Sequence, residues 1–169
     1  MSDKRRCNSE ETPVNLLHNL TGYHRALAHA LFRAFPKWKP HARMVQGKQE
    51  LEVEFEIPDP VPGRNLPLQI RSWGGEALVS FAGWHTHIFF YKESYEEHAQ
   101  KVVKWLQTFL EERIVVYAQT GADGRYTGGG HFSLPMSEQA QGFVNKMQPL
   151  EFRSWYGTYD GPNPPQEAA

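Results

Sequence analysis

Apolar residues in the first part of the chain recur at steps of three and four positions, which is typical of an amphipathic helix. We therefore predict a helix over residues 13–35. Thr12 followed by Pro13 fits its start, because threonine caps free N–H groups and proline suits the first helical position. Pro36 and Pro40 end it. The apolar positions are Leu16, Leu17, Leu20, Tyr23, Leu27, Leu31 and Phe35.

The next segment alternates strictly between apolar residues and glutamates. Leu51, Val53, Phe55 and Ile57 alternate with the glutamates around them, which predicts a strand with one buried face. A stiff proline-rich turn follows, and residues 66–73 return as a second strand. Residues 76–82 form a third strand after a two-glycine hairpin turn, and 84–91 continue it beyond a bulge or bend at Gly83.

The second half of the chain begins with a helix signal. Ser94 and Glu97 have the spacing of a capping box, so we predict a helix over about 95–112. The β-branched residues 114–118 indicate a central strand. Residues 125–134 return from a turn at 121–124, and Gly128–Gly130 suggest that this segment is irregular or flexible. A short helix over 138–147 and a last strand over 150–159 complete the pattern.

Consecutive strands favour antiparallel pairing, so the predicted fold class is α+β. We expect a single twisted, mainly antiparallel sheet with two main helices and one short helix packed on it. Residues 1–11 form a flexible leader, 12–159 a single domain and 160–169 a disordered tail.

Composition narrows the function classes. The chain has 169 residues, of which 40% are hydrophobic and 13% aromatic, enough for a real core. A net charge of -1 argues against a dedicated nucleic-acid binder. No apolar run approaches the ~20 residues that cross a bilayer, and no signal-peptide pattern follows the N-terminus, so we expect a cytoplasmic protein without membrane contact. Cys7 is the only cysteine, which excludes an intrachain disulfide.

His85 and His87 are candidate metal ligands. Two residues apart on a strand, their side chains share a face and lie about 7 Å apart, close enough to bind one zinc ion. A catalytic zinc needs a third protein ligand and an open position for water. His98, His131, Glu93 and Glu97 are candidates, and no spacing selects among them. Alternatively, the pair lies at a sheet edge with ring nitrogens bonded to backbone or water.

The segment Gly83–His87, with Ser94 and Glu97 downstream, partly resembles the motif of the JAMM (MPN-type) metalloproteases. The resemblance implies that His85 and His87 bind zinc and that Glu97 takes the place of the family's aspartate. Ser94 would stabilise the oxyanion, and one of the upstream glutamates would act as the base. The match is out of register: the serine comes one residue early, and isoleucine stands where the family has proline.

Residues 76–130 also resemble a group of small bacterial cytoplasmic proteins with a Gly-x-Trp-His-Thr-His strand and a later Gly-rich hairpin. Some members look similar to immunity proteins of bacterial toxin systems. This resemblance implies a binding function and assigns no site residues.

Two surfaces are candidates for binding a partner. One is an acidic stripe on the first predicted strand, formed by Glu50, Glu52, Glu54 and Glu56. In one interpretation the stripe is a solvated sheet face that lies opposite Arg71 or another basic group. In the other it docks a basic protein. In the last strand, alternation puts Trp155 and Tyr159 on one face and Phe152 and Tyr156 on the other. One of these faces should belong to the core. The other is a partner surface, for which we select Trp155 and Tyr159, unless the tail or a dimer mate covers it.

We therefore expect a non-enzymatic binding protein, in one version an immunity-type protein, that uses an acidic or aromatic sheet face and needs no cofactor. A zinc-dependent hydrolase built on His85 and His87 is the first alternative. A small-molecule binder, with the histidine pair in a cavity between sheet and helices, is the second.

Overall fold

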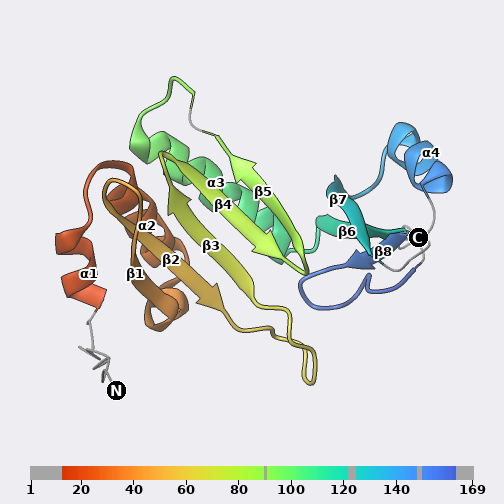
Figure 1. The fold of residues 1–169 in the computed structure, drawn as a ribbon, viewed down its shortest axis with the longest axis horizontal. Coiled ribbons are helices and arrows are strands. Elements are labelled where there is room, and N and C mark those ends of the chain that lie inside the picture. The colour runs from red at the N-terminus through yellow and green to blue at the C-terminus, as the bar shows by residue number, and fades with distance from the viewer. Residues whose placement is uncertain (1–12, 90, 122–124, 148–149, 163–169) are drawn as a thin grey trace, which may run out of the picture.

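The computed structural model describes residues 13–89, 91–121, 125–147 and 150–162, which form helices and two antiparallel sheets (Figure 1). The predicted α+β class is confirmed. The single sheet is wrong, because the last three strands pair with one another and form a second sheet. The leader 1–11, Thr12, most of the turn at 121–124 and tail residues 163–169 lie outside the described residues.

The larger sheet is a five-stranded meander in which each strand pairs antiparallel with the next. Its strands are β1 (Ala42–Gln46), β2 (Leu51–Ile57), β3 (Leu68–Trp73), β4 (Glu76–Phe81) and β5 (Trp84–Ile88). β1 was not predicted. Ala82 and Gly83 have φ angles of 52° and 79°, so they form the hairpin turn between β4 and β5. Gly83 is therefore a turn residue and not a bulge within one long strand.

The predicted helix over 13–35 is two helices, α1 (Pro13–Asn19) and α2 (Gly22–Ala34). Thr21 is extended, with φ -122° and ψ 167°, and Gly22 follows with a φ of 46°. Both residues interrupt the helical backbone, although the apolar periodicity runs across the break. The 3₁₀ helix η1 (Pro36–His41) then leads into β1.

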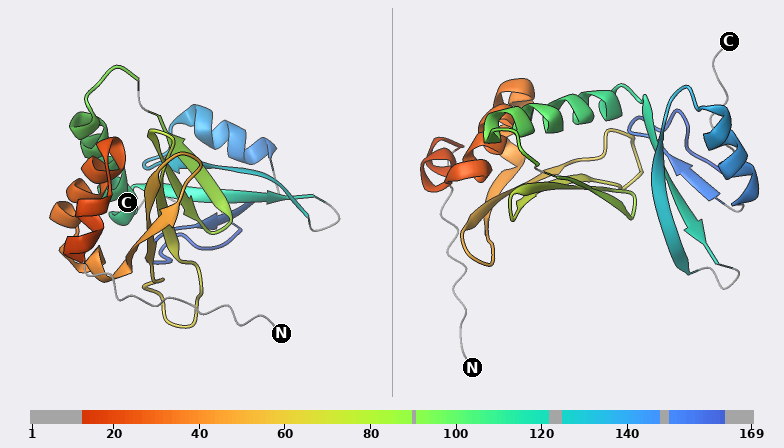
Figure 2. Two further views of the ribbon diagram at one scale, coloured as in Figure 1. Left: turned by 60° about the vertical axis from the view of Figure 1, so that its left-hand side comes forward. Right: turned by 90° about the horizontal axis from the view of Figure 1, so that it is seen from above.

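Helices α2 and α3 (Tyr95–Leu110) cover one face of the five-stranded sheet, and no described helix covers the other (Figure 2). α3 starts with the predicted capping box: the Glu97 N–H donates to Ser94 Oγ (3.2 Å), and the Ser94 N–H donates to the Glu97 carboxylate (2.8 Å). Leucine and phenylalanine side chains fill the layer between helices and sheet. Each fully buried side chain of this kind contributes about 1.5–3 kcal/mol. This layer includes Leu27, Leu31, Phe55, Ile70, Phe81, Leu106 and Phe109.

The smaller sheet has the order β7-β6-β8, with β6 (Ile114–Thr120) in the predicted central position. β7 (Tyr126–Ser133) and β8 (Leu150–Arg153) flank it, and the predicted short helix is α4 (Glu138–Lys146). These elements enclose a second core that includes Val115, Val144, Leu150 and Phe152.

The three glycines of β7 lie in a paired strand, and the predicted irregularity is a local register shift beside Gly128, opposite Gln119 and Thr120 of β6. Gly128, Gly129 and Gly130 pair with Gln119, Ala118 and Tyr117 of β6. A Cβ atom at Gly129 would lie 2.6 Å from the Tyr117 carbonyl oxygen. One at Gly130 would lie 2.7 Å from the Tyr117 hydroxyl. The glycines therefore leave room for the tyrosine on the neighbouring strand.

The predicted strand over 150–159 ends at Arg153, and the chain turns through residues 154–161. Ser154 N–H donates to Asp160 Oδ1 (2.9 Å), and Tyr159 N–H donates to Ser154 Oγ (3.0 Å). The turn brings Gly161 back against Phe152. Asp160 and Gly161 thus belong to the fold and not to the tail in which we placed them.

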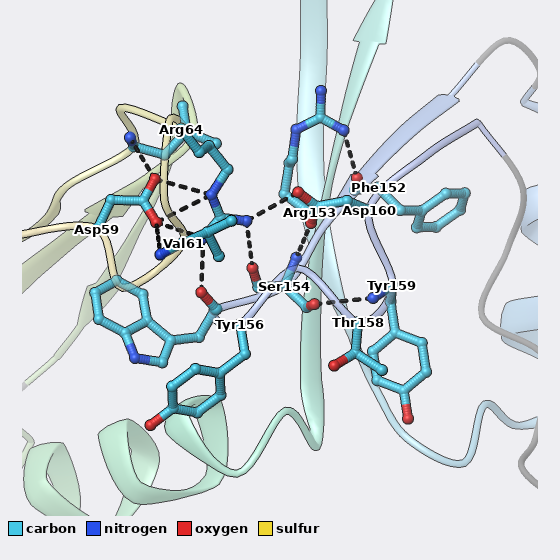
Figure 3. A network of polar contacts seen from close by, with 12 residues as sticks. Asp59, Val61, Arg64, Phe152, Arg153, Ser154, Tyr156, Thr158, Tyr159 and Asp160 are labelled. Atoms are coloured by element: carbon cyan, nitrogen blue, oxygen red, sulfur yellow. Dashed lines mark hydrogen bonds and ion pairs between the residues drawn. The ribbon is translucent and has the colours of Figure 1, made fainter.

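Arg64 holds this turn against the β2–β3 loop (Figure 3). Its guanidinium makes a two-pronged ion pair with Asp59, with contacts of 2.8 and 2.9 Å. It also donates to Asp160 (2.8 Å), to the Ser154 carbonyl (2.9 Å) and to the Trp155 carbonyl (2.6 Å). We call this group the Arg64 clamp. It joins a loop of the larger sheet to the segment that follows the smaller one.

Burial alone would raise the pKa of Asp59. Hydrogen bonds from Arg64 and from the N–H groups of Val61 and Leu66 outweigh burial and hold the pKa of this carboxyl below its usual range. Asp59 is therefore an ionised, fully paired member of the Arg64 clamp.

Candidate functional site

The face of the five-stranded sheet opposite α2 and α3 carries most of the side chains that sequence analysis selected. We call it the open face. The strand registers place Arg71 and Trp73 of β3 and Glu76 of β4 on it with His85 and His87 of β5. β2 contributes the alternate positions Glu52, Glu54 and Glu56. Side chains that are distant in the sequence thus lie together on one surface of the sheet.

The acidic stripe is largely paired with arginines. Arg71 Nε lies 2.7 Å from Glu52 Oε2, and Arg43 of β1 forms an ion pair with Glu54 and lies 3.8 Å from Glu56. Glu52 is only 3% exposed, although we expected all four glutamates on a solvated face. The arginines neutralise charge that would otherwise attract a basic partner. The alternative in which the stripe faces Arg71 therefore describes Glu52 better.

Glu50 leaves the stripe and lies at the turn between β1 and β2. Its carboxylate accepts hydrogen bonds from Thr21 Oγ1 (3.0 Å) and from His24 Nε2 (2.9 Å). The bonds from His24 and Thr21 lower the pKa of Glu50. His24 is buried, and its Nδ1 lies 2.7 Å from the hydroxyl of Ser72, which accepts a hydrogen bond from Val53 N–H (2.9 Å). A polar chain thus crosses from the end of the sheet into the core.

The Ser72–His24–Glu50 chain has the residue types of a hydrolase triad but not the access that one needs. Ser72 is fully buried and engaged by backbone, so its hydroxyl cannot reach a substrate. The chain stabilises α2 against the sheet. Sequence reasoning missed His24, although a histidine within the apolar stripe of a helix was a usable signal for a buried hydrogen-bonded group.

His85 and His87 share the open face, as the strand spacing predicted. Their ring centroids are 5.5 Å apart, and His87 Nδ1 lies 2.7 Å from Glu76 Oε1. A carboxylate on one ring nitrogen fixes the ring and leaves the other nitrogen available, as in many metal-binding histidines. Within the described ranges, however, no three His, Cys, Asp or Glu side chains are grouped so that they could hold a metal ion.

The four suggested third ligands are engaged elsewhere. Glu97 caps α3, and Glu93 forms an ion pair with Lys101. His98 is buried with Nε2 3.0 Å from the Ile88 carbonyl, and burial lowers its pKa. His131 packs against tryptophan rings, and burial lowers its pKa too. The structure therefore does not bring together the constellation that the JAMM resemblance implies.

An aromatic patch lies on the open face next to the histidine pair. Trp73 is 39% exposed and Phe89 55% exposed, and His87 lies between them with ring-centroid distances of 5.9 and 5.7 Å. We call Trp73, His87 and Phe89 the aromatic patch. Exposed aromatic side chains in contact with one another are typical of binding surfaces. Trp73 and Phe89 were not predicted as site residues, because only pairing across β3, β4 and β5 brings them together.

A hollow of about 350 Å³ lies beside the aromatic patch, at the end of the sheet where the β1–β2 and β3–β4 turns meet. Trp73 forms part of its wall. Its charged lining consists of three glutamates and Lys48, with buried His24 among them. The glutamates are Glu50, Glu52 and Glu76. Carboxylates beside an exposed indole suit a cationic group.

The two aromatic candidates from the C-terminal segment, Trp155 and Tyr159, pack on the two cores. Trp155 is buried against Phe81 and Phe109 of the main core, and Tyr159 packs partly buried on the second core. The alternation on which the prediction depended stops at Arg153, where the strand ends. Tyr156 is the exposed aromatic side chain of this turn.

No family model, curated protein or solved structure matches the chain. Among the described residues, no helix is both long and apolar enough to cross a membrane.

Proposed function

We propose that the protein is a non-enzymatic binding module that docks a protein partner on the open face, with the aromatic patch as the anchor. The single observation that carries the proposal is the exposure of Trp73 and Phe89 around His87, on a sheet face that no described helix covers. Large aromatic side chains contribute most of the binding energy at many protein interfaces.

The hollow indicates which partner chemistry fits. Three glutamates border it, but Glu52 is buried and already paired with Arg71, so Glu50 and Glu76 carry the accessible negative charge, and Lys48 is the opposing charge on the lining. An arginine or lysine side chain of the partner would find carboxylates there and the face of Trp73 for a cation–π contact. The acidic part of the surface is thus smaller than the predicted stripe, and it lies at the end of the sheet instead of along β2.

Short peptides on an array, rich either in arginine and lysine or in neutral residues, provide the test. Basic peptides should bind the wild-type protein, and Trp73→Ala and Phe89→Ala should each weaken binding by about tenfold or more. Tyr126→Ala is the matched control, because Tyr126 is also 55% exposed but lies on β7. Equal losses for Tyr126→Ala and Phe89→Ala would contradict the proposal, as would equal binding of neutral peptides.

Metal binding by His85 and His87 is a second candidate function, favoured by the carboxylate on His87 Nδ1. With two histidines alone, the protein should bind zinc weakly and lose that binding in His85→Ala. Calorimetry with zinc chloride tests this, and unchanged zinc affinity in His85→Ala would contradict it. A zinc hydrolase would need a third ligand as well, and the described residues near the pair do not provide one.

A further inference from the structure

Charge is unevenly distributed along the chain, although the total is close to zero. Residues 12–49 contain six Lys or Arg and no Asp or Glu. Residues 50–169 contain nine Lys or Arg and sixteen Asp or Glu. Helix α2 lies within the first segment and carries no acidic residue. The molecule thus combines a basic helical region with an acidic remainder.

The exposed side of α2 carries Arg25, His29 and Arg33, each one helical turn from the next. The two guanidinium groups lie two helical turns apart on the same side of α2. Neither arginine has a carboxylate within ion-pair distance in the described part of the chain. Unpaired basic side chains in a row are typical of a surface that meets negative charge.

These side chains border a groove of about 570 Å³ between α2 and α3, which lie side by side (Figure 2). Small residues of both helices, Ala26, Ala30 and Ala99, form part of its lining. Glu96 of α3 lines it too, so one carboxylate stands against the two arginines and the groove keeps a net positive charge. The exposed ring of Tyr95 stands at one end, near Gly22. A surface lined by small residues allows another backbone to approach closely.

We propose that this groove binds an acidic α-helix of a protein partner. Carboxylates four residues apart on such a helix repeat about every 6 Å, which matches the spacing of Arg25, His29 and Arg33 on α2. Phosphates of a nucleic acid are the competing source of negative charge. They fit less well, because the acidic excess elsewhere on the protein opposes a long polyanion. The groove lies on the helical side and is thus separate from the open face.

Fluorescence anisotropy with labelled alanine-based helical peptides tests the proposal. One peptide carries glutamates every four residues, and the second has the same composition in scrambled order. The periodic peptide should bind the wild-type protein and should lose about tenfold or more in affinity with Arg25→Glu/Arg33→Glu. Lys37→Glu/Lys104→Glu changes the net charge equally at exposed positions outside the groove and should leave binding within about twofold.

Four results would overturn the proposal: no binding to the wild-type protein, equal binding of the scrambled peptide, equal losses in both double variants, or tighter binding of an anionic DNA oligonucleotide through the same arginines. Circular dichroism checks that each variant folds. Should Arg25→Glu/Arg33→Glu fail to fold, Arg25→Gln/Arg33→Gln removes the same charges and gives the same decisive comparison.

Discussion

Replacing Arg64 by methionine removes the guanidinium of the Arg64 clamp and keeps much of its hydrophobic stem. The Arg64 side chain is 12% exposed and that of Asp59 is 4% exposed, so the pair lies nearly out of water. In Arg64→Met, Asp59 loses its cation, and the carbonyls of Ser154 and Trp155 lose a charged donor. A desolvated carboxylate without its partner is costly.

The expected loss in the free energy of unfolding is about 3 kcal/mol. Removing one partner of a buried ion pair costs about 3–5 kcal/mol. The lower end applies, because Asp59 keeps hydrogen bonds from the backbone N–H groups of Val61 and Leu66. The free energy of unfolding of a typical domain is about 5–15 kcal/mol, so the variant should still fold.

Urea unfolding followed by tryptophan fluorescence measures this loss. Arg43→Met is the matched control: Arg43 also pairs with a carboxylate, that of Glu54, but its side chain is 61% exposed. An exposed pair contributes about 0–1 kcal/mol, so Arg43→Met should cost no more than that. A loss below about 1 kcal/mol in Arg64→Met, or equal losses in the two variants, would refute the reasoning.

The difference between wild type and Arg64→Met should also depend on pH. The folded-state pKa of Asp59 is lowered, so its stabilisation is present above the unfolded-state pKa of about 3.9 and is lost as the pH falls through the folded-state value. The stability difference should therefore be largest near neutral pH, where Asp59 is ionised in both proteins, and should shrink as acid protonates Asp59 first in the variant and then in the wild type. A difference that grows in acid would contradict the assignment.

Two further predictions concern β7 and α3. Gly129→Ala should destabilise the protein by about 1–3 kcal/mol in urea unfolding, because its Cβ would lie 2.6 Å from the Tyr117 carbonyl oxygen. Gly128→Ala should cost less, since nothing lies within 4 Å of a Cβ atom there. A larger loss in Gly128→Ala than in Gly129→Ala would show that the contact with Tyr117 is relieved. Ser94→Ala removes the cap of α3 and should lower the free energy of unfolding by about 1 kcal/mol. Ser94→Thr should keep part of this stability, because the threonine hydroxyl can also accept the hydrogen bond from Glu97 N–H. An unchanged midpoint of urea unfolding in Ser94→Ala would exclude a role for the cap.

Local patterns predicted the elements whose signals are complete within a few residues. The alternation in β2 and the capping box of α3 are both confirmed. The break between α1 and α2 was missed, because the apolar stripe continues across Thr21 and Gly22. The division into two sheets depends on which strands pair, and pairing between β6 and β8 joins residues more than thirty positions apart. No local periodicity carries that information.

For the candidate site, strand parity placed His85 and His87 on one face, and the structure agrees. The alternation along one strand does not determine which side chains of the neighbouring strands lie beside the two histidines. Glu76 beside His87 and Trp73 beyond it follow only from the registers of β3, β4 and β5. Trp155 shows the opposite failure: the alternation was extended beyond the real end of β8, which assigned a core residue to a surface.

The Arg64 clamp closes contacts between residues 90 and 96 positions apart. Contacts over such long stretches of chain form late, since the entropy of closing the loop must be offset first. The transition state for folding should then lack the clamp. Substitutions in it would leave the refolding rate nearly unchanged and speed up unfolding, so the clamp sets the lifetime of the native state more than the time needed to reach it.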